Sequence, residues 1–154
     1  MIASYLLASI ADVRIAVPVS VVEEIIRAVA VTPLPSAPSI IEGTINVRGV
    51  LLPVIDLRVR LDLPRRAVDP SDFLIVLRLP TRRAVIRVDD ADDVAQIDDA
   101  SIATPTSLST SLAGTAVIAG VAATDDGALV IYDPAVFLSQ SELEATAEAL
   151  STST

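Results

Sequence analysis

The strongest structural signal in this chain is the stretch Gly43-Thr-Ile-Asn-Val-Arg-Gly-Val-Leu-Leu-Pro-Val-Ile-Asp-Leu57. It holds two apolar runs, 45–47 and 50–55, which are joined across Arg48 and Gly49. Glycine has no Cβ atom and adopts positive φ without a clash, so a glycine between two runs rich in β-branched residues is typical of a β-hairpin. The stretch therefore predicts two antiparallel strands that reverse at Gly49.

The first strand of this hairpin has one polar and one apolar face. Side chains alternate along a strand, so Thr44, Asn46 and Arg48 share one face. Ile45 and Val47 share the other face, which we expect to pack in a core. The guanidinium of Arg48 is a rigid fork of donors suited to carboxylates. On residue type alone Arg48 is more simply a solvated turn residue, so its role depends on the rest of the chain.

The composition argues against several classes of function. The chain has 154 residues, 52% hydrophobic and 3% aromatic, so its core consists of Val, Ile, Leu and Ala. The net charge is −9 and every basic residue is arginine, which disfavours nucleic acid and anionic lipid as partners. Cys and His are both absent, which removes thiol nucleophiles, zinc-thiolate sites and the commonest general base. We therefore expect no enzyme, no metal site and no cofactor.

The sequence shows no targeting or membrane-spanning segment. The N-terminus lacks a basic region, and its first apolar run is interrupted by Ser4 and Ser9. No apolar run approaches the roughly 20 residues that a membrane helix needs. The sequence therefore predicts a cytoplasmic protein without direct membrane insertion.

Short apolar runs separated by turn signals recur along the chain. They predict nine or ten strands, and hence an all-β fold of one barrel or a pair of barrels. The polar segment 65–72 is the best candidate for a boundary between two subdomains. Helical turns are predicted at 39–42, 57–63 and 134–138, a long loop at 101–113, and a hairpin turn at Asp125-Asp126-Gly127.

The C-terminal residues predict a helix. Ser141 and Glu144 have the spacing of a capping box, with Ser141 at the N-cap position. Leu143, Ala147 and Leu150 then lie on one apolar stripe. Residues 139–154 are therefore interpreted as a helix with a frayed tail.

Six aspartates form three doublets between Asp89 and Asp99. Clustered carboxylates can bind Ca²⁺, but the spacing lacks the glycine and the terminal glutamate of an EF-hand loop. Paired carboxylates also serve in acid–base catalysis, yet adjacent residues of a strand point to opposite faces. We interpret the segment as a solvated acidic loop and strand edge. The alternative is an acidic metal- or small-molecule-binding barrel.

Several motifs in this order resemble the CheW family, the adaptors of bacterial chemotaxis-type signalling. They are Val17-Pro-Val-Ser-Val-Val-Glu-Glu-Ile-Ile26, Gly43-Thr-Ile-Asn-Val-Arg-Gly49, Leu52-Pro-Val-Ile-Asp-Leu57 and Gly127-Ala-Leu-Val-Ile-Tyr-Asp-Pro134. The resemblance covers nearly the whole chain. It implies a single CheW-like domain over 1–154, in which two five-stranded SH3-like barrels surround a shared hydrophobic core, with short helices and a C-terminal helix.

The resemblance also implies a function and a set of binding residues. It implies a non-enzymatic adaptor that couples chemoreceptors, the methyl-accepting proteins, to a CheA-type histidine kinase. The partners would be the cytoplasmic helical hairpin of the receptors and the regulatory domain of the kinase. Whether the pathway serves flagella, a pilus or another output stays open. The receptor-facing positions that match are Arg48, Asn46, Gly43, Gly49, Phe73 and Ala91, and the kinase-facing positions are Val22, Glu24 and Ile25.

Overall fold

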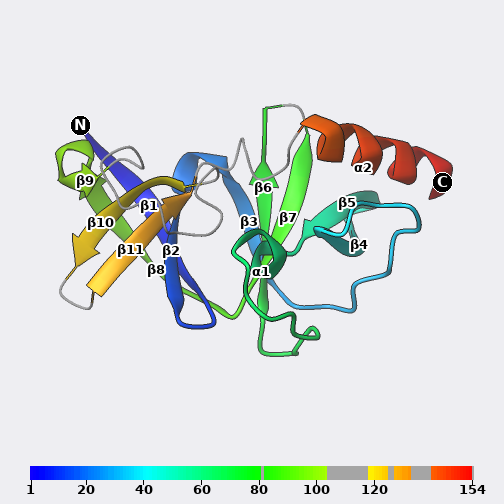
Figure 1. Cartoon of the computed structure of the whole chain (residues 1–154), viewed down its shortest axis with the longest axis horizontal. Coiled ribbons are helices and arrows are strands. Elements are labelled where there is room, and N and C mark those ends of the chain that lie inside the picture. Colours follow the sequence, from blue (N-terminus) through cyan, green and yellow to red (C-terminus); the bar gives the residue numbers. More distant parts are fainter. Residues whose placement is uncertain (81, 104–117, 125–126, 133–139, 154) are drawn as a thin grey trace.

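The structure, a computed structural model, describes residues 1–80, 82–103, 118–124, 127–132 and 140–153 (Figure 1). Within these ranges the chain forms two β-sheets, short helical turns and one longer C-terminal helix. We call the sheet built from β3–β7 the central barrel. We call the sheet built from β1, β2 and β8–β11, which come from both ends of the chain, the terminal barrel.

The central barrel is a five-stranded sheet with the strand order β3-β6-β7-β5-β4. Neighbouring strands are antiparallel, except that β5 and β7 are parallel. Thr32, which follows β3, forms a bridge with Thr44 of β4 through reciprocal backbone hydrogen bonds of 2.9 and 2.7 Å. This bridge brings the two edges of the sheet together. The strands are β3 (Val22–Arg27), β4 (Ile41–Val47), β5 (Val50–Ile55), β6 (Phe73–Arg78) and β7 (Arg83–Val88).

The terminal barrel repeats this arrangement. Its order is β8-β1-β2-β11-β10-β9, and β2 and β11 form its parallel pair. Strand by strand, β1 and β2 correspond to β6 and β7, whereas β8, β10 and β11 correspond to β3, β4 and β5. Along the sequence, the central barrel is therefore inserted between β2 and β8 of the terminal barrel. The strands are β1 (Ile2–Ile10), β2 (Val13–Pro18), β8 (Asp90–Asp98), β9 (Ile102–Ala103), β10 (Ile118–Thr124) and β11 (Gly127–Tyr132).

The chain crosses between the barrels at two places. It enters the central barrel after Pro18, through the turn η1 (Val19–Val21), and leaves it after Val88. Residues 65–72, the predicted subdomain boundary, instead connect α1 (Leu57–Arg60) to β6 within the central barrel. The prediction was wrong because β6, which follows this segment, pairs with β3 and β7 of the same sheet. Most of the segment is exposed, but Arg66 and Asp72 join an ionic cluster that is described below.

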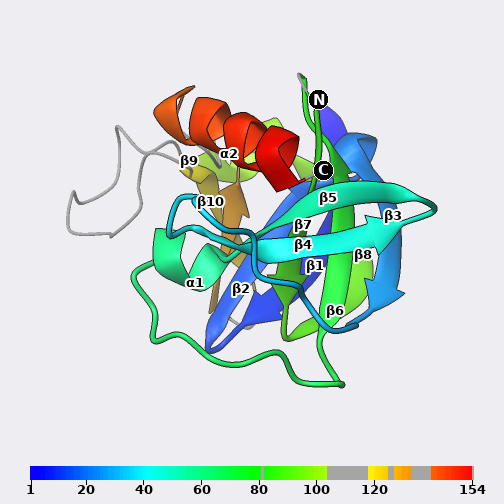
Figure 2. The ribbon, with the colours of Figure 1, turned by 90° about the vertical axis from the view of Figure 1, so that its right-hand side faces the viewer.

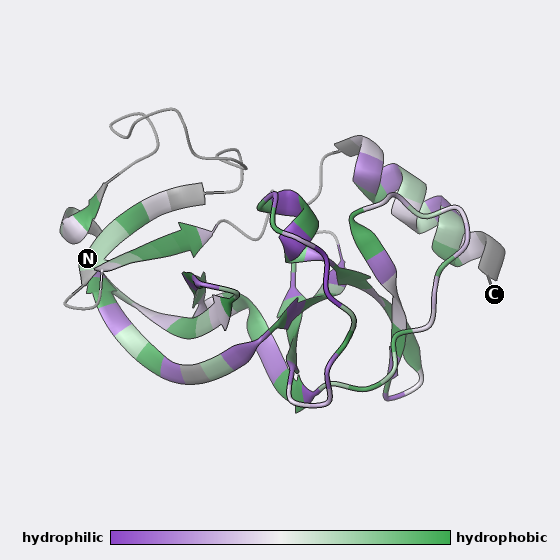
Figure 3. Cartoon of the chain, turned by 60° about the horizontal axis from the view of Figure 1, so that its bottom comes forward, coloured by the Kyte–Doolittle hydropathy of each residue, from purple (hydrophilic) through white to green (hydrophobic). Residues whose placement is uncertain are grey.

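Three apolar clusters fill the described part of the molecule, and they confirm two β-sheets, one of five and one of six strands, around a shared core. One, which includes Val54 and Val76, fills the central barrel, and another, which includes Ala16 and Ile131, fills the terminal barrel. The third cluster takes residues from both sheets. Each fully buried aliphatic side chain contributes roughly 1.5–3 kcal/mol. Apolar residues accordingly dominate the strands of both barrels (Figure 3).

The shared core explains why β6 is a continuous apolar run. Side chains on opposite faces of a strand alternate, so Leu74 and Val76 point into the central barrel while Ile75 and Leu77 pack in the shared core. All four are fully buried. A strand that is buried on both faces needs apolar residues at every position.

The local predictions that fail concern helix ends. Residues 39–42 are not helical, because β4 already begins at Ile41. The C-terminal helix, α2 (Gln140–Ser153), begins one residue before Ser141, so Ser141 lies within the helix and not at its N-cap.

The predicted long loop at 101–113 contains a short strand, because Ile102 and Ala103 form β9. The predicted features at 104–113 and 134–138 and the turn residues Asp125 and Asp126 lie outside the described residues.

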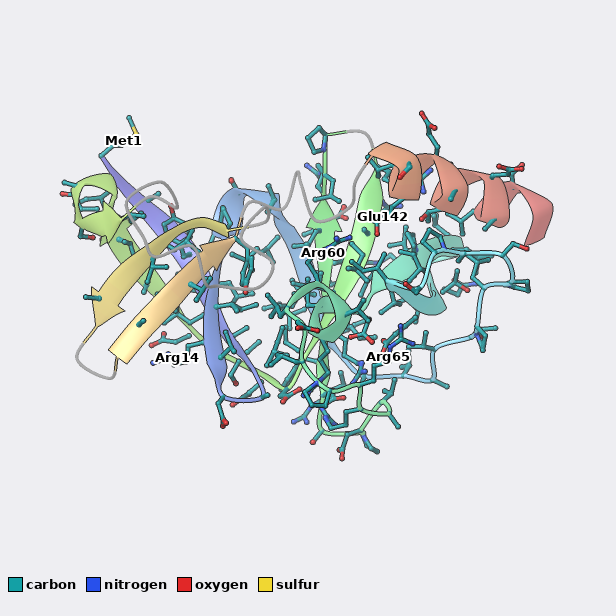
Figure 4. The ribbon with its side chains drawn as sticks, viewed as in Figure 1. Met1, Arg14, Arg60, Arg65 and Glu142 are labelled. Atoms are coloured by element: carbon teal, nitrogen blue, oxygen red, sulfur yellow. The ribbon has the colours of Figure 1, made fainter. Side chains whose placement is uncertain are left out.

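The helix α2 lies along the β4–β5 side of the central barrel (Figures 1 and 2). Arg60 of α1 and Glu142 of α2 form an ion pair of 2.5 Å, which ties the two helices together (Figure 4). In the described part of the chain, no helix has both the length and the apolar character required to cross a membrane.

Candidate docking surface

The β4–β5 hairpin ends in a two-residue turn made of Arg48 and Gly49. Both residues have positive φ, 51° and 85°, and the flanking Val47 and Val50 are paired. Turns with positive φ at both central positions match the twist of the strands they join. The Gly49 N–H donates a hydrogen bond of 2.8 Å to Oδ1 of Asn46. The predicted hairpin is confirmed, and Asn46 fixes the turn that presents Arg48.

Arg48 forms an ion pair with Glu24 of β3. Its Nη2 donates to Oε1 at 2.9 Å, and Nη1 lies 2.8 Å from Oε2. The Arg48 side chain is 72% exposed and that of Glu24 is 23% exposed. Strand β3 is an edge strand of the sheet, and Ile25 on it is 42% exposed. The structure therefore brings a residue matched to the receptor side into direct contact with one matched to the kinase side.

Gly43 does not lie on this surface. It is buried, and a Cβ atom there would stand 2.1 Å from the carbonyl oxygen of Thr32. Only a residue without a side chain allows the segment after β3 to approach β4 so closely. The structure thus gives Gly43 a role in closing the central barrel, whereas Gly49 has open space around its Cα.

Phe73, Ala91 and Val22 pack partly against the shared core. Phe73 begins β6, and the Arg27 guanidinium lies 4.8 Å from the centroid of its ring. Ala91 lies in β8, where it pairs with Ala8 of β1. These three residues therefore lie where the two barrels meet, and no hydrogen bond or ion pair links them to Arg48. We define the docking surface as Arg48, Asn46, Gly49, Glu24 and Ile25.

A buried ionic cluster lies beneath the 65–72 segment, and the sequence did not predict it. Arg87 of β7 is 3% exposed and donates to Asp72, which is 2% exposed, at 2.9 Å. Its Nε also donates to both oxygens of Glu42 at 3.1 Å. Burial on its own would lower the pKa of Arg87, but Glu42 and Asp72 raise it. The only signal in the sequence was a charged residue inside the apolar strand 84–88.

Asp89 extends the ionic cluster to the terminal barrel. Nη2 of Arg58 donates to both of its oxygens at 2.8 Å, Arg66 donates to Oδ1 at 2.8 Å, and the Ala11 N–H donates to Oδ2 at 2.8 Å. Partial burial would raise the pKa of Asp89, but the donors from Arg58, Ala11 and Arg66 lower it to about 2. Ala11 has a φ of 53° in the β1–β2 turn, so Asp89 holds a strained turn in place.

The interpretation of 89–99 as a solvated acidic segment is therefore wrong for Asp89. It holds for the side chains of Asp90, Asp93 and Asp98, which are exposed along the edge strand β8. The side chains of Asp92 and Asp99 lie outside the described residues. Across the described ranges, no group of three or more acidic residues is arranged to hold a metal ion.

Comparison with known proteins agrees with this architecture. The structure of the scaffolding protein TtCheW from Thermoanaerobacter tengcongensis superposes with a TM-score of 0.81 and 30% identity, covering 92% of this chain and 91% of that one. The chemotaxis protein CheW of Klebsiella aerogenes is 32% identical over 113 residues, 73% of this chain and 68% of that protein. The probable chemotaxis protein CheW of Rhizobium etli is 29% identical over 138 residues, 88% and 87% of the two chains.

The fold, two β-sheets joined by a shared core, is thus similar to that of a solved scaffolding protein. The family model described as the CheW-like domain matches residues 4–142. The chain therefore belongs to the CheW-like domain family.

Proposed function

We propose that this chain is a non-enzymatic adaptor that couples chemoreceptors to a CheA-type histidine kinase in chemotaxis-type signalling. The whole chain acts as one CheW-like domain. Its partners are the cytoplasmic helical hairpin of the receptors and the regulatory domain of the kinase, which places the chain in the cytoplasm. Membership of the family and the similarity to chemotaxis proteins support this function.

The observation that carries the proposal is the rigid display of Arg48. Gly49 and Asn46 fix the turn, and Glu24 holds the guanidinium, yet most of the side chain stays exposed. A pre-ordered arginine loses less conformational entropy when it binds a carboxylate than a free one does. Ile25 on the adjoining strand adds exposed apolar area. Charged and apolar groups side by side suit a helical partner with acidic and aliphatic residues.

We assign two faces to the docking surface. Arg48, Asn46 and Gly49 contact the receptor, and Glu24 and Ile25 contact the kinase. Val22, which begins β3 next to this surface, also contacts the kinase. Phe73 and Ala91 contribute to the receptor side at the junction of the barrels, and Gly43 acts indirectly by holding β4 in place. Because Arg48 and Glu24 are bonded to each other, binding at one face changes the environment of the other.

Co-sedimentation tests the function. The chain is mixed with the helical hairpin fragment of a chemoreceptor from the same organism and with the kinase, and the kinase activity of the pellet is measured. We expect a ternary complex and a kinase activity that differs from that of kinase with receptor alone. A chain that sediments with neither partner would rule out the adaptor function.

A further inference from the structure

A pocket of about 240 Å³ lies at the starting ends of the parallel strands β5 and β7, under the C-terminal helix. Residues 50–53 of β5 form one wall, Arg82 and Arg83 form another, and Leu150 of α2 also lines the pocket. Val50 and Leu51 are 43% and 39% exposed. The pocket therefore combines an aliphatic wall with two cationic side chains.

Arg82 is unlike the other arginines of this chain. Its Nη1 atom is buried and has no hydrogen-bond partner, and no contact within the described residues pairs its guanidinium with a carboxylate. Nε of Arg60 is also buried without a hydrogen bond, but Arg60 pairs with Glu142. Each of the other arginines has an ion pair, a hydrogen bond, a ring contact or another electrostatic interaction, and Arg83 beside Arg82 lies 3.4 Å from Glu23. A buried donor left unpaired loses its hydration without compensation. A carboxylate in the pocket would supply that compensation.

The chemistry of the pocket identifies the group that it would take. A guanidinium binds carboxylates in two-pronged geometry, and the aliphatic wall excludes water from the contact. The matching group is a glutamate or aspartate side chain flanked by aliphatic residues. The chain has a net charge of −9, so the local positive charge of Arg82 stands out against an acidic molecule.

The position of the pocket identifies the partner. Val50, which lines the pocket, directly follows Gly49 of the turn that presents Arg48. The pocket is thus continuous with the proposed receptor face. We propose that an acidic side chain of the receptor hairpin, flanked by aliphatic residues, docks on Arg82 in this pocket. This inference rests on the proposed function, because it assumes that the receptor hairpin binds at Arg48.

Calorimetry with the receptor hairpin fragment tests the inference. The full-length chain is compared with Arg82→Met, which keeps the apolar volume and removes the charge. Because a hydrogen-bonded charge pair is lost, we expect the Kd to rise by about tenfold or more. Since no described residue pairs with the Arg82 guanidinium in the free chain, the melting temperature of Arg82→Met should equal or exceed that of the wild type, whereas a structural role would lower it.

Arg78→Met is the matched control, because Arg78 lies at the end of β6, outside the pocket, and its side chain is 72% exposed. Its Kd should stay within about twofold, since exposed charges contribute little and are screened by salt. An Arg82→Met chain that binds the fragment as the wild type does would overturn the inference and leave the adaptor function intact. The inference would also be overturned if Arg78→Met weakened binding of the receptor fragment as much as Arg82→Met does. The same holds if Arg82→Met weakened binding of the kinase but not of the receptor fragment. A wild-type chain that binds no receptor fragment would overturn the proposed function itself.

Discussion

Arg48 and Arg87 both form ion pairs with a glutamate, but they differ in almost every other respect. Arg48 is 72% exposed at the tip of a hairpin and has one carboxylate partner. Arg87 is 3% exposed in the middle of the molecule and donates to Glu42 and Asp72 as well as to backbone carbonyls. An exposed pair contributes little to stability, whereas a buried charge that loses its partner is very costly.

Ion pairs between arginine and carboxylate therefore serve two purposes in this molecule. The ionic cluster around Arg87 and Asp89 joins β7, the 65–72 segment, α1 and the β1–β2 turn, so it fixes the two barrels relative to each other. The Arg48–Glu24 pair links the hairpin tip to an edge strand and leaves the guanidinium accessible. We interpret the first as structural and the second as a docking device.

The same substitution at both arginines tests this contrast with the largest expected effect. Arg87→Met removes the guanidinium that pairs with the buried Asp72 and the partly buried Glu42, so the free energy of unfolding should fall by about 3–5 kcal/mol. Arg48→Met should lower it by at most about 1 kcal/mol, as for an exposed pair. Urea denaturation followed by circular dichroism measures both. If Arg87→Met and Arg48→Met unfold at the same urea concentration, the difference in burial between Arg87 and Arg48 does not separate a structural from a docking role.

The two glycines of the central hairpin sharpen the contrast. Gly43→Ala forces a Cβ atom against the Thr32 carbonyl, so we expect a loss of about 1–3 kcal/mol in stability, as in overpacked cores. Gly49→Ala has room for its methyl group but must hold a φ of 85°, which costs about 1–2 kcal/mol. Thermal melting measures both. A Gly43→Ala chain that melts like the wild type but fails to bind receptor would instead place Gly43 in direct contact with the partner.

The acid dependence of stability tests the role of Asp89. Its pKa is lowered to about 2 in the folded chain, so its contribution is fully present above the unfolded value of 3.8 and is lost as the pH falls through 2. Since the side chain is partly exposed, Asp89→Asn should cost only about 1–2 kcal/mol at pH 7. The difference from the wild type should shrink between pH 4 and pH 2 in urea titrations. A constant difference across that range would show that the charge of Asp89 has no part in joining the barrels.

The sequence predicted the features that depend on neighbouring residues. The hairpin at 43–57 was readable because Gly49 and the alternation of Ile45 and Val47 are local signals. The shared core was implied by the family resemblance, and the continuous apolar run of β6 is consistent with burial on both faces. Family motifs also led to Arg48 and Glu24, although nothing local indicated that they touch.

What the sequence missed depends on contacts between distant residues. Arg87 is bonded to Glu42, 45 residues away, and its charge looked like an ordinary polar position on one face of a strand. The central barrel is inserted into the terminal barrel because β1 and β2 pair with β8 and β11, which follow the central barrel in the chain, and no turn signal marks these pairs. The composition of the polar segment 65–72 predicts a boundary, because a solvated linker and a loop that contributes to an ionic cluster have similar compositions.

Binding of the receptor hairpin fragment by Arg48→Ala, measured by isothermal titration calorimetry, tests the docking role most directly. We expect the free energy of binding to weaken by about 1.5–3 kcal/mol, because a charge-assisted hydrogen bond is lost, while the melting temperature stays near that of the wild type. If Arg48→Ala binds the fragment with unchanged affinity, Arg48 does not dock the receptor, and the docking surface lies on another part of the barrels.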